Sequence, residues 1–188
     1  MTTPTRVAGW GMTDDGAAVT WTIADGRQGR RWREVVARGA EMVHALLLET
    51  DAGGRFSHLE LARADGLWTL HPEPDGTLHG NHVERGEPGV RHIVGLPFSP
   101  DDVVVVAGST IGLAALAWGQ AGSIAEGGIA DLGGVVIRAG GQLDAVSDLR
   151  LERLSLTAWR VGEGRAFEID ATGFPVLEGG EMRPLEQV

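Results

Sequence analysis

Short segments of alternating apolar and polar residues, separated by glycine-rich turns, run through most of this 188-residue sequence. The stretch from Gly66 to Phe98 shows the pattern most densely, because the turns PEPDG and RGEPG fall between three alternating segments. Alternation with a period of two is typical of β-strands that bury one face. The pattern therefore predicts an antiparallel meander of short strands joined by tight turns.

The segments that alternate or are short and apolar give the expected strands: 17–23, 31–38, 43–49, 56–63, 67–70, 77–84, 89–96, 103–107, 135–138, 149–161, 166–170 and 174–177. Residues 110–118 have the composition of a short helix. We expect a loosely ordered lead-in over 1–16 and a mobile loop over 120–134, where no period is visible. The 29 glycines, about twice the usual share, suit many tight turns.

The predicted fold is mainly β and consists of a single domain over residues 1–188. We expect a strongly curved antiparallel sheet, half-barrel or barrel-like, with one or two short helices. A chain of this length is enough for one sizeable core, and neither an internal repeat nor a linker divides it.

Charge and cysteine content exclude several classes of function. The formal net charge of −10 argues against nucleic acid as a partner, because binding to phosphates is largely electrostatic. The absence of cysteine removes disulfides, thiolate metal sites and a cysteine nucleophile. The N-terminus lacks the apolar stretch of a signal peptide, and no apolar run is long enough for a transmembrane segment. We therefore expect a cytoplasmic protein.

The central segment holds four of the six histidines, namely His71, His79, His82 and His92. A zinc site needs three or four nitrogen, oxygen or sulfur ligands. Alternation along strand 77–84 places His82 and Glu84 on one face and His79 on the other, so this strand alone does not assemble a metal site. We predict no metal and no cofactor.

Motifs for other chemistries are missing. Ser109 lacks the Gly-x-Ser-x-Gly setting of a hydrolase nucleophile. The glycine-rich stretch AEGGIADLGG matches neither a P-loop nor a dinucleotide-binding fingerprint. Asp101 and Asp102 stand together in a predicted turn, where we expect them to be solvated rather than to form a glycosidase pair.

The sequence has six tryptophans and no tyrosine: Trp10, Trp21, Trp32, Trp68, Trp118 and Trp159. Tryptophan buries a large apolar body, so one interpretation is core packing. The other is that several line an apolar cavity inside a curved sheet, as in small barrels that hold one ligand. An arginine at the mouth, such as Arg31, Arg33 or Arg91, would then contact an anionic or sugar head group.

Several short landmarks follow one another in an order that can be compared with a known family: VTWTI, RRWRE, LELARADGLWTL, GTLHGNHVE, VRHIVGLPF and FEIDATGFPVL. This order resembles the bacterial glycolipid-binding family, formerly a domain of unknown function. The resemblance implies a β-rich half-barrel similar to lipoprotein-carrier folds, and a glycolipid as ligand. The chain departs from the family where an acidic central strand is reduced to Glu84 and where GLPFSP replaces an arginine-rich exit, so the ligand's identity stays open.

The leading hypothesis is non-catalytic binding of an amphipathic or apolar small molecule in the concave face of the sheet. The predicted ligand-binding residues are Trp32 and Trp68 as apolar walls, Arg33 and Arg91 as head-group contacts, and His82 and His92 as polar contacts. One alternative is a hydrolase or isomerase that uses His82 or His92 with Glu84. The other is a protein-interaction module without a small-molecule ligand, and the open edges of a half-barrel also allow a homodimer.

Overall fold

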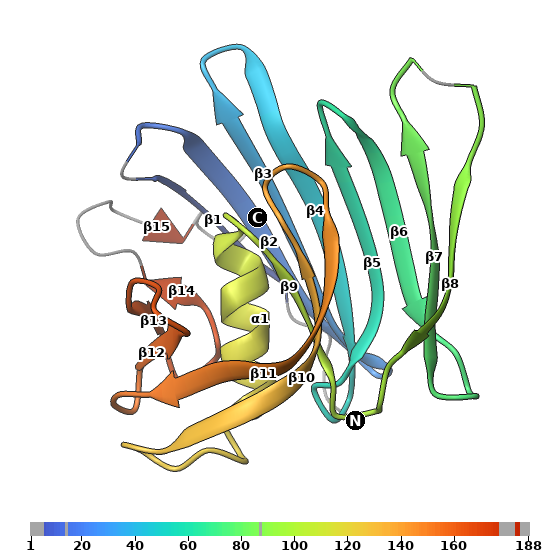
Figure 1. The fold of residues 1–188 in the computed structure, drawn as a ribbon. Coiled ribbons are helices and arrows are strands. Elements are labelled where there is room, and N and C mark those ends of the chain that lie inside the picture. Colours follow the sequence, from blue (N-terminus) through green and yellow to red (C-terminus); the bar gives the residue numbers. More distant parts are fainter. Residues whose placement is uncertain (1–5, 14, 87, 177–182, 185–188) are drawn as a thin grey trace.

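The protein consists of two β-sheets that enclose one helix (Figure 1). The computed structural model describes residues 6–13, 15–86, 88–176 and 183–184. The prediction of a mainly β, strongly curved fold is confirmed, and among the described residues there is one helix. The strands are divided between two sheets, because the strands within residues 103–176, β9 to β14, form a second sheet of their own.

The larger sheet, sheet A, has nine strands and is antiparallel throughout. In spatial order its strands are β15 (Arg183–Pro184), β1 (Arg6–Met12), β2 (Ala18–Gly26), β3 (Gly29–Arg38), β4 (Glu41–Asp51), β5 (Phe56–Arg63), β6 (Gly66–Pro72), β7 (Thr77–Glu84) and β8 (Arg91–Pro97). From β1 to β8 it is the predicted meander, in which each strand pairs with the next. The predicted alternation also holds: Trp21, Trp32 and Trp68 all point to the buried, concave side.

The smaller sheet, sheet B, has six strands and curls around the helix (Figure 1). In spatial order they are β14 (Pro175–Val176), β13 (Phe167–Ile169), β12 (Ala158–Val161), β11 (Leu143–Arg153), β10 (Ile129–Ile137) and β9 (Val103–Val106). β9 and β10 run parallel, whereas the other pairs are antiparallel. A parallel pair needs a crossover, and the helix α1 (Thr110–Gln120) supplies it.

Helix α1 is apolar on most of its surface because sheet A lies on one side of it and sheet B on the other (Figure 1). Its first turn is capped by Ser109, whose hydroxyl accepts a hydrogen bond from the backbone N–H of Gly112 at 2.8 Å. The buried carboxylate of Glu34 on β3 accepts a second one, from the N–H of Ile111 at 2.9 Å. The other oxygen of Glu34 is 2.7 Å from His44 Nε2 on β4, so three buried polar groups fix the start of α1 against sheet A.

The structure differs from three expected segments. Residues 1–16 are not a loose lead-in throughout, since β1 pairs with β2 along its whole length. One glycine of this strand has a packing role: a Cβ on Gly9 would lie 2.2 Å from the ring of Trp21.

The expected loop over 120–134 ends early, because β10 begins at Ile129. The turn before it is tied down by Arg153, whose guanidinium donates to the carbonyls of Ala121 and Ile124, each at 2.8 Å. The expected strand 149–161 is two strands separated by a turn. In that turn the hydroxyl of Ser155 accepts a hydrogen bond from the N–H of Ala158 at 3.0 Å, and the exposed Leu154 and Leu156 gave it the appearance of a strand.

Candidate functional site

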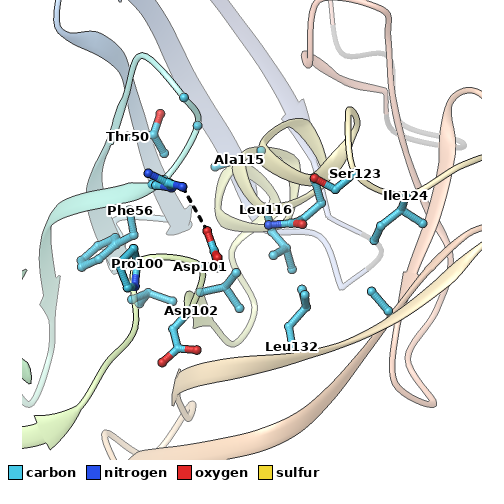
Figure 2. Close-up of a pocket in the computed structure, with 18 of the residues that line it drawn as sticks. Thr50, Phe56, Pro100, Asp101, Asp102, Ala115, Leu116, Ser123, Ile124 and Leu132 are labelled. Carbon is cyan, nitrogen blue, oxygen red and sulfur yellow. Dashed lines mark ion pairs between the residues drawn. The ribbon is translucent and has the colours of Figure 1, made fainter. Parts of the chain in front are cut away.

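A cavity of about 460 Å³ opens between the two sheets beside the C-terminal end of α1 (Figure 2). Sheet A contributes β4, β5 and the turn between them, and the other walls come from the segment before β9, from β9, α1, the turn after it and β10. The cavity therefore lies on the concave side of sheet A, where a ligand was expected. Its size falls within the usual range of small-molecule sites.

The inner wall of the cavity is apolar. Leu48 points inward from β4 because the alternation of that strand buries every second residue. Leu116 comes from α1, Ile124 from the turn after it, and Leu132 from β10 (Figure 2). Val104 comes from β9. All five are aliphatic, so this part of the cavity suits a hydrocarbon group.

The rim of the cavity is polar. Arg55 and Asp101 form an ion pair there, with 3.3 Å between Arg55 Nη2 and Asp101 Oδ1, and both side chains are mostly exposed (Figure 2). Asp102 is only partly exposed and accepts a hydrogen bond from the N–H of Ser99 at 2.7 Å, so it fixes the turn before β9. Gln120 and Ser123 add an amide and a hydroxyl to the rim. The solvated turn expected at Asp101 and Asp102 is thus part of a cavity entrance.

Trp32 lies behind this cavity instead of in its wall. Its indole N–H donates to the hydroxyl of Thr50 at 3.5 Å, and Thr50 itself lines the cavity. The ring of Trp32 packs edge-on against Trp118 at 5.7 Å, and the guanidinium of Arg30 lies 5.1 Å from the ring. Trp32 is fully buried and supports the cavity indirectly.

The structure brings Trp68, His82 and Arg91 together on the concave side of β6, β7 and β8. The His82 ring stacks on Trp68, with 3.9 Å between centroids and 15° between planes. The Arg91 guanidinium lies 5.5 Å from the Trp68 ring, and its Nη2 donates to His82 Nδ1 at 3.4 Å. Burial, and then the charge of Arg91, lower the pKa of His82 despite the opposing influence of Glu84. His82 is therefore neutral at pH 7.

The other two predicted residues do not join the stacked group of Trp68, His82 and Arg91. Arg33 is exposed on the convex face of β3, four strands from β7. His92 is exposed on β8, opposite Asn81, and its Nδ1 is 2.8 Å from Asn81 Oδ1. Since His82 pairs with Arg91 in the same ladder, His82 and His92 point to opposite faces of the sheet. Of the two alternatives, His92 with Glu84 therefore does not form an acid–base pair on this face, whereas His82 Nδ1 lies 3.6 Å from Glu84 Oε1.

Sequence reasoning missed the residues that line the inter-sheet cavity. Many of them belong to α1, β9 and β10, whose packing against β4 depends on contacts between distant parts of the chain. One local signal was available: the alternation through Leu46, Leu48 and Thr50 marks the buried face of β4. It identifies a core-facing surface, although it cannot say whether that surface is covered.

Two other features are missing from the described residues. No group of three or more histidine, cysteine, aspartate or glutamate side chains in the described ranges is arranged to hold a metal ion. No helix among these residues has the length and apolar character needed to cross a membrane.

Comparisons with known proteins add little to these observations. No family model matches the chain, and no curated protein matches it. Among solved structures, the chain is similar to the crystal structure of a DUF1089 family protein from Pseudomonas aeruginosa, with 15% identity and a TM-score of 0.42. The match covers 93% of this chain and 88% of that chain. At this TM-score the likeness carries no argument about family or function.

Proposed function

We propose that the protein binds an amphipathic small molecule, without covalent chemistry, in the cavity between the two sheets. The observation that carries this proposal is the division of the cavity into an aliphatic inner wall and a polar rim. The apolar part of the ligand would occupy the space between Leu48, Leu116 and Leu132. Its head group would remain at the entrance, near Gln120 and Ser123.

The charges of the rim favour a neutral head group that carries hydroxyls. Arg55 is balanced by Asp101, and the carboxylate of Asp102 adds a further negative charge. An anionic head group would meet net repulsion there, whereas hydroxyls can donate to the carboxylates and accept from the amide of Gln120. A glycolipid has this combination of a hydrocarbon chain and hydroxyls, so it is the ligand class that we favour.

Calorimetric titration with octyl glucoside below its micellar concentration tests the proposal. We expect saturable binding to the full-length protein. Glucose alone should bind at least about tenfold more weakly, because it cannot fill the apolar wall. Octanoate should also bind more weakly, because its carboxylate would lie beside Asp102.

Two serine variants show where the ligand binds. Ser123→Trp places a large ring at the rim and should weaken binding of octyl glucoside by about tenfold or more, since Ser123 lines the cavity and is exposed. Ser147→Trp is the matched control, because Ser147 is exposed on β11 and does not line the cavity. Absence of saturable binding, or equal effects of the two variants, would contradict the proposal.

A further inference from the structure

A second hollow, of about 540 Å³, lies along the outer edge of β8. It touches the four successive residues from Arg91 to Val94. Successive side chains of a strand point to opposite faces, so a hollow that contacts four in a row runs along the edge of the strand. β8 is the last strand of sheet A, and the opposite wall is formed by residues 141–144, at the beginning of β11.

Trp68 lines this hollow with a hydrogen-bond donor that has no partner. The residue is fully buried, and its indole Nε1 makes no hydrogen bond within the described part of the chain. The adjoining edge of the ring lies near Gly141, where a Cβ would be 3.9 Å from Trp68 Cζ2 and 2.5 Å from a carboxylate oxygen of Asp65. Gly141 lines the same hollow. A buried donor without a partner is costly, so an acceptor placed in the adjoining hollow would be stabilising.

Arg91 supplies a second donor at the same place. Its guanidinium lies over Trp68, and no carboxylate of the described residues is within ion-pair distance of it. The acidic side chain in the lining, Asp144, is already paired with Arg138 Nε at 2.7 Å. His82 Nδ1 holds the guanidinium in position from the side away from solvent. Two donors thus meet in one hollow, where the lining carboxylate, Asp144, is engaged by Arg138.

We propose that this hollow binds a monocarboxylate with a short apolar body. Its carboxylate accepts hydrogen bonds from the Trp68 indole and the Arg91 guanidinium, a charge-assisted arrangement. Its apolar body lies against Val94, Leu96 and Leu143, which line the same hollow. A single negative charge fits better than a phosphate dianion, because Glu84 lies 3.6 Å from His82 and the protein is acidic overall. This site is separate from the inter-sheet cavity and does not depend on the function proposed for it.

Indole N–H resonances in two-dimensional NMR report on this site directly. The Trp68 resonance is assigned with the Trp68→Phe variant, and the protein is titrated with hexanoate. We expect the Trp68 resonance to shift saturably, as the N–H gains an acceptor. The Trp159 resonance is an internal control. That indole N–H is also buried and has no partner among the described residues. Arg153 lies 5.1 Å from its ring, but Trp159 lines neither hollow. It should not move.

Variants and related probes separate the site from general charge effects. Arg91→Gln should weaken hexanoate binding by about tenfold or more, whereas Arg33→Gln, which removes an exposed arginine from the convex face, should not change it. Ser123→Trp, which blocks the inter-sheet cavity, should leave the titration unchanged. The proposal is overturned if the Trp68 resonance does not respond, if Arg33→Gln acts like Arg91→Gln, or if hexanamide or inorganic phosphate shifts the resonance as strongly as hexanoate.

Discussion

The buried pair of Glu34 and His44 should contribute more to stability than any exposed ion pair of the protein. Glu34 is almost completely buried, and each of its oxygens has a partner: His44 Nε2 at 2.7 Å and the N–H of Ile111 at 2.9 Å. Glu34→Ala removes both acceptors at once and leaves a cavity. Breaking a buried pair in this way costs about 3–5 kcal/mol, a large part of the roughly 5–15 kcal/mol that stabilises a typical domain.

Urea unfolding followed by circular dichroism measures this loss. With a denaturant dependence of about 2 kcal/mol per molar, the midpoint for Glu34→Ala should fall by about 1.5–2.5 M. Glu34→Gln keeps an acceptor for the N–H of Ile111 and a donor for a neutral His44, so we expect a smaller loss of about 1–2 kcal/mol. Hydrogen exchange at the Ile111 amide should accelerate in Glu34→Ala, because the start of α1 loses its contact with β3.

Glu49 provides the matched control. It pairs with Arg31 between the same two strands, β3 and β4, but on the solvent-exposed face. Glu49→Ala should therefore cost no more than about 1 kcal/mol. If Glu34→Ala costs no more than Glu49→Ala, the assignment of Glu34 as the anchor of α1 is refuted.

Three further predictions follow from single positions. Burial lowers the pKa of His82 below 6.5, so as the pH falls the unfolded chain binds a proton before the folded chain does. The free energy of unfolding should therefore decrease as the pH drops through about 6.5, by at most about 1.4 kcal/mol per pH unit. Urea unfolding of His82→Gln should show a weaker dependence on pH. In Gly80→Ala the new Cβ would lie 1.9 Å from the carbonyl oxygen of Thr69, so calorimetry should show a Tm lower by about 3–10 °C. Gly122→Ala is the control: apart from its two chain neighbours, no atom of the described residues lies within 4 Å of its new Cβ, so its Tm should stay within about 2 °C of the original. Arg30→Lys loses the bidentate contact with Asp25 and the stacking on the indoles of Trp32 and Trp118. Urea unfolding should show a free energy of unfolding that is lower by about 1–3 kcal/mol.

Most strands of sheet A could be predicted from the sequence because their information is local. In β3, alternation alone separates the buried Trp32 and Glu34 from the exposed Arg31 and Arg33. Each turn of this meander is short, so neighbouring strands in the sequence are also neighbours in the sheet. Sheet B was harder to predict from the sequence. Its strands β9 and β10 pair with each other although the helix α1 separates them along the chain.

The candidate sites were only partly predictable for the same reason. The sequence places Trp68, His82 and Arg91 on three neighbouring strands, and strand pairing brings these residues together. It cannot show that residues 141–144 form the opposite wall of a hollow beside them. Arg33 was predicted to bind a ligand because of its charge. However, it directly follows the buried Trp32 in β3, so the alternation of side chains along the strand already places it on the convex face.

Both hollows have a common origin in the unequal widths of the two sheets. Nine strands at about 4.8 Å spacing make sheet A about 38 Å wide, whereas a helix with its side chains measures about 10–12 Å across. Sheet B has six strands and curls around α1, so it cannot cover the rest of the concave face (Figure 1). The uncovered parts lie where α1 ends beside β4 and β5, and at the free edge of β8. The global packing of the sheets, and not a local motif, therefore creates both candidate binding sites.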